Sequence, residues 1–146
     1  MINSIVEKHI DAIKTDLETA VFLSKLVKDN QSILDDVFTS SIVKMCIEYE
    51  SFTTEAHKFV FPGKPIKYNH PWRYTRELSE KLKIDISKEY ELAHESWEIY
   101  NTIKHLNERM LILRNKICEK ENLKNIEEIS IFINATLISL LKKFLV

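Results

Sequence analysis

The chain has 146 residues, of which 45% are hydrophobic and 29% are charged, and its formal net charge is −1. These proportions are ordinary for a globular protein and exclude an intrinsically disordered chain, and the length predicts one domain over residues 1–146. One glycine and three prolines are too few for the many tight turns of an all-β fold, so helix is the expected secondary structure.

The charges are unevenly distributed. Residues 1–57 contain five Lys or Arg against ten Asp or Glu, residues 58–83 contain seven against two, and residues 84–146 contain nine against ten. The basic region is therefore local to residues 58–83. The two cysteines, Cys46 and Cys118, are too few for a disulfide scaffold, and the N-terminus lacks the pattern of a signal peptide, so a cytoplasmic location is expected.

Hydrophobic periodicity predicts five helices in chain order. The expected elements are a first helix from Asn3 or Ser4 to about Lys28, a second over about 32–61, a short third over 72–83, a central helix over 87–117 and a last helix over 126–144. Together they predict an all-α, up-and-down helical bundle with four long helices and one short helix.

The last helix is apolar on more than one face, which leaves three interpretations open: a buried central helix, an oligomer contact or a membrane anchor. The apolar run from Ile129 to Leu141 contains Asn134 and is shorter than the ~20 residues that span a bilayer. We therefore expect no membrane association.

The central helix carries the strongest candidate site. At 100° per residue, one polar stripe is formed by His94, Glu98, Asn101 and His105. The opposite side is apolar and contains Leu92, Ile99, Ile103, Leu106 and Met110. An imidazole can act as general acid or base near neutral pH, and an amide can donate to a phosphate. The alternative is a solvated polar face on an ordinary amphipathic helix.

Within this helix, the segment Tyr100-Asn101-Thr102-Ile103-Lys104-His105 resembles the Arg-Asn-x-x-x-His signature of HEPN domains. The resemblance implies a four- or five-helix bundle that is usually dimeric and occurs in toxin–antitoxin, abortive-infection and RNA-processing systems. Many members are metal-independent ribonucleases whose Arg and His lie across the dimer interface, and others have lost the motif and act as binding modules.

Two positions match this signature, Asn101 and His105, whereas Tyr100 stands where the family has arginine. A guanidinium is always charged and can bind two phosphate oxygens, whereas a phenol offers one neutral donor. Lys104 or Arg109 could supply the missing charge. The resemblance thus implies His105 as general acid or base, Asn101 as a positioning group, and Tyr100 or Lys104 as phosphate contacts.

The basic region is the second candidate, because its cations alternate with aromatic residues. The residues expected to bind RNA there are Lys64, Lys67, Tyr68, Trp72, Arg73 and Arg76. Cations can contact a phosphate backbone while aromatic rings stack on unpaired bases. In the alternative interpretation, the aromatic rings close the end of the core and the lysines solvate it.

Other chemistry has little support in the sequence. His9, His57 and His70 have no spacing typical of a zinc site, a single Glu-x-x-His (Glu91–His94) does not make a di-metal bundle, and one glycine excludes a Gly-rich phosphate loop. We therefore expect no metal or cofactor.

Two functional hypotheses follow. The first is a HEPN-like, RNA-directed protein, either a metal-independent ribonuclease toxin of a toxin–antitoxin or antiviral defence system or a member with weakened chemistry. It would act as a homodimer through the face of Asn101 and His105, with an antitoxin or other protein as a further partner. The second is a non-catalytic helical module that binds a protein through the basic region and the last helix.

Overall fold

The computed structural model describes residues 2–64, 71–105 and 107–146, and these residues form helices and no strand. In chain order the elements are α1 (Ile2–Leu26), α2 (Gln31–Val60), α3 (Pro71–Leu82), α4 (Ser87–Lys104), α5 (Glu108–Lys120) and α6 (Ile126–Lys142). The expectation of an all-α fold is confirmed.

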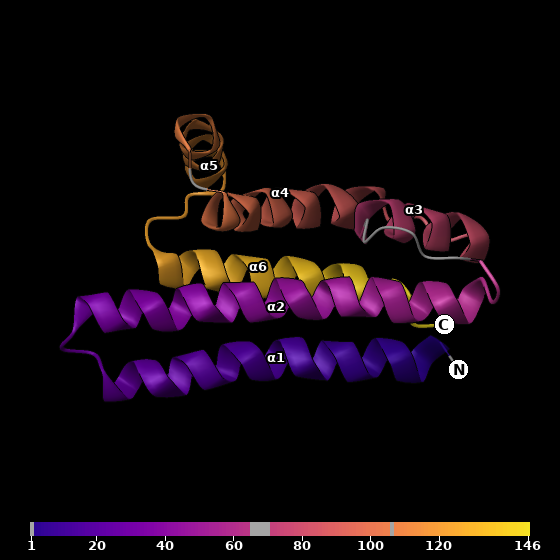
Figure 1. Cartoon of the computed structure of the whole chain (residues 1–146), viewed down its shortest axis with the longest axis horizontal. Coiled ribbons are helices and arrows are strands. Elements are labelled where there is room, and N and C mark those ends of the chain that lie inside the picture. Colours follow the sequence, from indigo (N-terminus) through magenta and orange to yellow (C-terminus); the bar gives the residue numbers. More distant parts are fainter. Residues whose placement is uncertain (1, 65–70, 106) are drawn as a thin grey trace.

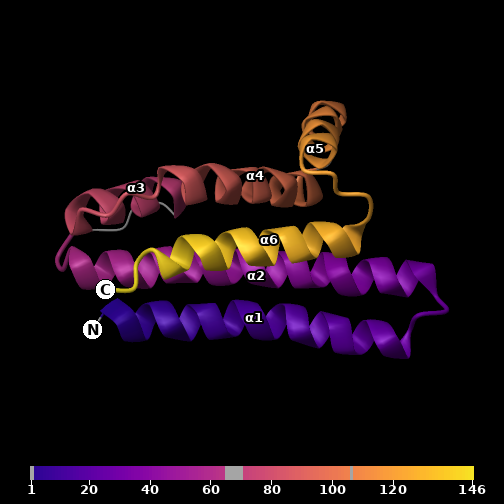
Figure 2. The ribbon, with the colours of Figure 1, turned by 180° about the vertical axis from the view of Figure 1, so that it is seen from behind.

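Four helices form the bundle, and successive members α1, α2, α4 and α6 alternate in direction (Figure 1). The chain ends lie together: the Asn3 side chain donates to the carbonyl of Val146 at 2.8 Å and accepts from its backbone N–H at 2.9 Å. Figure 2 shows from behind that α1 and α5 lie on opposite sides of the bundle. The short helix α3 packs against α2.

The long helix α2 follows the predicted apolar periodicity. Its start is capped by Asn30, whose side chain accepts a hydrogen bond from the N–H of Ile33. The stripe that faces the core is fully buried and contains Phe38, Ile42, Met45, Tyr49, Phe52 and Ala56. The helix ends just before Gly63, which takes a positive φ of 84° that favours glycine.

Three interpretations of the apolar faces of the last helix, α6, were open. The structure agrees with the first of them, a buried central helix. The helix contacts α1, α2 and α4, and Ile133, Leu137 and Leu140 are fully buried. Its one internal amide, Asn134, donates to the carbonyl of Ile13 at 2.9 Å, which satisfies a polar group beside the core. Within the described ranges, no helix is long and apolar enough to cross a membrane.

The prediction of one central helix over residues 87–117 is wrong, and six helices replace the five expected. The helix stops at Lys104, and α5 begins at Glu108 after its own N-cap, Asn107, whose side chain accepts from the N–H of Met110 at 2.9 Å. α5 projects from the outer side of α4 (Figures 1 and 2) and packs mainly against that helix through Ile117. Met110 therefore does not continue the apolar face of α4.

Candidate nucleic-acid interface

The break after α4 places the matched histidine at a helix end. His105 is the C-cap residue, and its backbone N–H donates to the carbonyl of Asn101 at 2.9 Å. Its side chain is exposed, as is that of Lys104, and Asn101 is half-buried. One turn of backbone therefore presents an imidazole, an ammonium and an amide near the same exposed corner of the bundle.

Tyr100, which stands at the motif's arginine position, lies in the core. The residue is only 3% exposed, and its ring meets Trp97 edge-to-face at 5.1 Å between centroids. Burial, together with the nearby acidic Glu50, raises the pKa of the phenol above its usual value, so it stays neutral at physiological pH. The Tyr100 ring therefore packs in the core of the bundle and is not presented to solvent.

The rest of the polar stripe on α4 is formed as the helical spacing predicts. His94 and Glu98 are half-buried, and the His94 Nδ1 lies 3.5 Å from a carboxylate oxygen of Glu98. A contact at this distance on a partly solvated helix face contributes little to stability. The stripe is accessible from His94 to His105.

In the basic region, two of the described cations lie beside one carboxylate. Lys64 Nζ lies 3.5 Å and Arg73 Nε 3.4 Å from the same oxygen of Glu77. The other oxygen of Glu77 lies 2.6 Å from Nε2 of His57, which is buried. Although desolvation acts in the opposite direction, the hydrogen bond from His57 and the charge of Lys64 hold the pKa of Glu77 below its usual value. Lys64 and Arg73 are thus partly neutralised.

Arg76 is exposed on α3, and within the described part of the chain it joins no ion pair. Lys67 and Tyr68, also predicted to bind RNA, lie outside the described residues. Of the residues proposed for RNA binding in this region, Arg76 is therefore an exposed cation whose charge no ion pair among the described residues neutralises.

Trp72 has a different environment from the one expected of a base-stacking residue. Its indole stacks on Tyr49 at 5.2 Å between ring centroids and meets Trp97 edge-to-face at 5.7 Å. It also meets Tyr90 and His94 edge-to-face, and its side chain is half-buried. This cluster joins α3 to α2 and α4, which agrees with the interpretation that the aromatic rings close the end of the core.

The predicted RNA-binding residue Trp72 contacts one end of the polar stripe but is not brought to His105. Trp72 of α3 contacts His94, near the middle of α4, and His105 lies eleven residues farther along the same chain segment, which is about 16 Å by helical rise. Figure 1 shows α3 at one end of α4 and α5 at the other. A ligand would have to span most of α4 to contact both segments.

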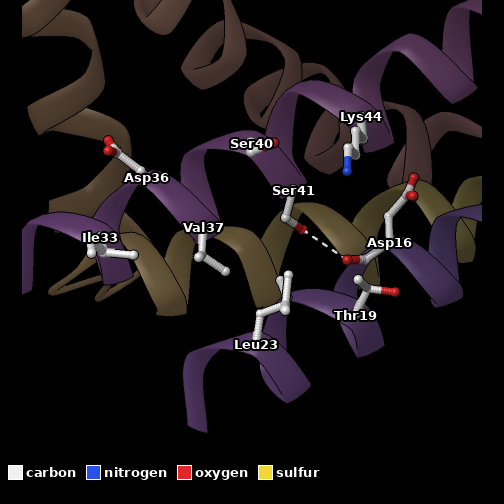
Figure 3. Close-up of a pocket in the computed structure, with 10 residues that line it drawn as sticks. Asp16, Thr19, Leu23, Ile33, Asp36, Val37, Ser40, Ser41 and Lys44 are labelled. Carbon is white, nitrogen blue, oxygen red and sulfur yellow. Dashed lines mark hydrogen bonds between the residues drawn. The ribbon is translucent and has the colours of Figure 1, made fainter. Parts of the chain in front are cut away.

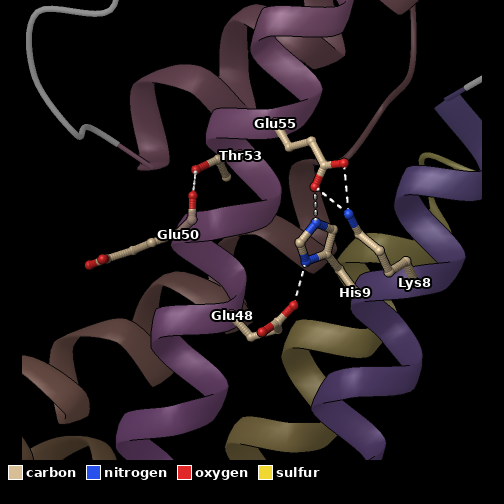
Figure 4. Close-up of polar contacts among 6 residues, drawn as sticks. All are labelled: Lys8, His9, Glu48, Glu50, Thr53 and Glu55. Atoms are coloured by element: carbon tan, nitrogen blue, oxygen red, sulfur yellow. Dashed lines mark hydrogen bonds and ion pairs between the residues drawn. The ribbon is translucent and has the colours of Figure 1, made fainter.

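A polar cluster around the buried His9, between α1 and α2, was not predicted from the sequence. His9 is 2% exposed; its Nδ1 lies 2.6 Å from Glu48 and its Nε2 2.8 Å from Glu55, which also binds Lys8 at 2.7 Å (Figure 4). An ionised carboxylate only accepts hydrogen bonds, so both contacts form together when both ring nitrogens carry hydrogen. The hydrogen bonds from Lys8 and His9 lower the pKa of Glu55.

This cluster clamps two helices and does not make a metal site. Across the described ranges, no group of three His, Cys, Asp or Glu side chains is arranged to hold a metal ion. The only sequence signal was the spacing of Glu48 and Glu55, seven residues apart on one face of α2. Their pairing with His9 depends on the register of α1 against α2, which periodicity does not give.

A cavity also lies between α1 and α2, farther toward their connecting turn (Figure 3). Burial and the nearby Glu48 raise the pKa of Asp16 there. The lining residues are Asp16, Thr19, Ala20, Leu23, Ile33, Asp36, Val37, Ser40, Ser41 and Lys44. None of them belongs to the sites predicted from the sequence.

Comparisons of the chain with protein-family models, with curated proteins and with solved structures find no match.

Proposed function

We propose that this protein is an RNA-directed protein of the HEPN type that acts through the exposed end of α4. The observation that carries the proposal is the position of Asn101, Lys104 and His105 on one turn at that end, with the His105 imidazole open to solvent. The alternation of α1, α2, α4 and α6 is compatible with a HEPN-like topology, and α3 and α5 are then the additional short helices.

In an active protein, His105 takes the proton from a ribose 2′-hydroxyl as that oxygen attacks the adjacent phosphorus. The bond from phosphorus to the 5′-oxygen breaks, and the leaving oxygen takes a proton from an acid. A homodimer through the face of Asn101 and His105 would supply that acid as the second copy of His105. This chemistry needs no metal, in keeping with the HEPN resemblance.

The charge that arginine supplies in the motif must come from another residue here. Because Tyr100 is buried, the phosphate contact passes to Lys104, whose ammonium is exposed, and Asn101 orients the phosphate by donating from its amide. Lys104 is a single point charge and not a bidentate fork, so weaker catalysis than from an intact motif is expected.

The second candidate function is a non-catalytic module that binds another protein. It is favoured by the replacement of the motif arginine with a core tyrosine, and by exposed apolar side chains on α5, Leu111 and Ile112. Exposed apolar residues grouped on a projecting element are typical of interaction sites. An antitoxin or other protein could bind this element under either proposal.

The test is incubation of purified protein with total RNA in the presence of a metal chelator, beside His105→Ala. Cleavage by the wild type that disappears in the variant, with both proteins shown to be folded by circular dichroism, supports the ribonuclease. Lys124→Ala, which removes an exposed residue before α6, is the control and should cleave normally. Intact RNA with folded wild-type protein favours the non-catalytic module.

A further inference from the structure

The helix α5 carries an exposed stripe whose ionisable groups are all basic. Arg109, Ile112, Leu113 and Lys116 lie at offsets 0, 3, 4 and 7, so they share one helical face. Together with Asn107 and Met110 they line a groove along that face. No acidic residue is among these lining residues.

Both cations are free to bind an anion. Arg109 and Lys116 are exposed, and neither forms an ion pair within the described part of the chain. Lys120 on the same helix differs, because its ammonium lies 2.5 Å from Glu95 of α4. The charges of Arg109 and Lys116 are thus available on the stripe, whereas that of Lys120 is neutralised near the helix end.

The stripe is unsuited to pairing with a second copy of itself. In an antiparallel two-fold contact centred between Ile112 and Leu113, Arg109 would face the second copy's Lys116. In a parallel contact each cation would face its own equivalent. Like charges meet in both arrangements and oppose association. The charge of the stripe is instead complementary to an anionic partner.

We infer that the stripe of α5 binds the backbone of a single-stranded RNA whose reactive phosphate lies at His105, an inference that rests on the proposed function. The groove begins beside the motif, since Asn107 is two residues from His105. Arg109 and Lys116 contact phosphates about two helical turns apart. Ile112, which is 53% exposed, offers an apolar surface between them on which an unstacked base can lie, whereas Leu113 is half-buried and packs against the core.

This inference gives α5 a function that its packing does not explain. The helix buries Ile117 and packs Leu113 and Cys118 partly against the core, whereas its exposed face extends the site beyond the single turn that holds Asn101 and His105. Arg109 and Lys116 are positioning residues for the substrate, because they act on its backbone and not on the reacting atoms.

The test measures binding of a fluorescein-labelled single-stranded oligouridine in the His105→Ala background, so that cleavage does not consume the probe. Arg109→Gln with Lys116→Gln is expected to weaken binding at least about tenfold. It should also reduce the slope of log K against log salt by about 1.4, the value for two single-strand phosphate contacts. The matched control is Lys14→Gln with Lys25→Gln, which removes two exposed charges from α1, on the opposite side of the bundle, and should leave binding unchanged.

Equal binding by the α5 double variant and the control overturns the inference, and so does failure of the His105→Ala parent to bind RNA. Sedimentation equilibrium on the same proteins detects a second copy of the chain bound to the stripe. A dimer that depends on Arg109 and Lys116 would place that second copy on the stripe and would also overturn the inference. Cleavage of total RNA by the wild type is scored separately. The proposed function can therefore stand while the α5 inference fails, and the two failures are distinguishable.

Discussion

The ammonium of Lys104 lies over the ring of Tyr100, 5.3 Å from its centroid. Tyr100 thus occupies the arginine position of the motif and at the same time holds the nearest cation against its own face. The Tyr100 ring is buried in the core of the bundle and Lys104 is exposed. The pair therefore connects the buried and exposed sides of α4 in the turn before His105. Tyr100 is therefore part of the packing of this helix.

Restoring the motif by Tyr100→Arg should therefore destabilise the protein. A guanidinium at this buried position would lie beside Trp97 without the aromatic contact that Tyr100 makes, and an unpaired buried charge costs about 3 kcal/mol or more. Tyr100→Phe keeps the ring and should cost less than about 1 kcal/mol. Urea denaturation followed by circular dichroism gives both values. Equal stability of Tyr100→Arg and the wild type would mean that the guanidinium reaches solvent or pairs with the nearby Glu50.

Trp72 offers a clear contrast between packing and RNA binding. Because its ring contacts Tyr49 and Trp97, Trp72→Ala should lower the free energy of unfolding by about 3 kcal/mol. Arg76→Ala, on the exposed side of the same helix, should change it by less than about 0.5 kcal/mol. Urea denaturation gives the unfolding free energies of both variants. If Trp72 stacked on bases instead, Trp72→Ala would weaken binding of a labelled single-stranded RNA and leave the unfolding free energy nearly unchanged.

The start of α5 depends on one side chain. Asn107 accepts a hydrogen bond from the N–H of Met110, and the loss of such a cap typically costs about 1 kcal/mol. Asn107→Ala should therefore loosen α5 first, which hydrogen exchange would detect as faster exchange of amides in residues 108–120. Asn107→Asp should restore protection, since aspartate is an equally good N-cap. Unchanged exchange in the alanine variant would show that packing of Ile117 alone holds the helix.

The long helices followed from hydrophobic spacing. In α2 that spacing predicts an apolar stripe from Leu34 to Phe59, and the residues of the stripe from Phe38 to Ala56 are buried, whereas Phe59 is 50% exposed. The break between α4 and α5 did not follow, because Ile103 and Met110 are seven residues apart and keep a helical period across it. The gap contains no glycine or proline. Asn107 is a good N-cap but is also tolerated inside a helix, so its capping role becomes visible only in the structure.

The candidate site was predictable only in part. The spacing of Asn101 and His105 predicts that they lie one turn apart on the same face of a helix, but whether Tyr100 faces the core or the solvent depends on how α4 packs. Composition alone did not distinguish Trp72 as a core residue from Trp72 as a base-stacking residue. The clamp of His9 with Glu55 joins residues 46 apart, a contact that only the packing of α1 on α2 defines.

The contacts of Glu55 with Lys8 and His9 lead us to expect that the stability of the protein depends on pH. The pKa of Glu55 is lowered in the folded protein, chiefly by the hydrogen bonds from Lys8 and His9, so the folded state favours the ionised carboxylate. The resulting stabilisation is present above the pKa of the unfolded chain and is lost as the pH falls through the lower pKa of the folded state. Glu55→Gln keeps an acceptor for the buried His9 but removes the charge, and should cost less than about 1 kcal/mol at pH 7, because Glu55 is partly exposed and water screens its charge.

The difference in unfolding free energy between the wild type and Glu55→Gln should therefore shrink as the pH falls below about 5, because the protonated wild-type carboxyl comes to resemble the amide. Urea denaturation at pH 7, 5, 4 and 3 measures it. Glu18→Gln, an exposed change on α1, is the control and should show little difference at any of these values. A difference for Glu55→Gln that stays constant from pH 7 to pH 3 would mean that the ionised carboxylate does not stabilise the contact between α1 and α2, and that the amide is unfavourable there for its shape alone.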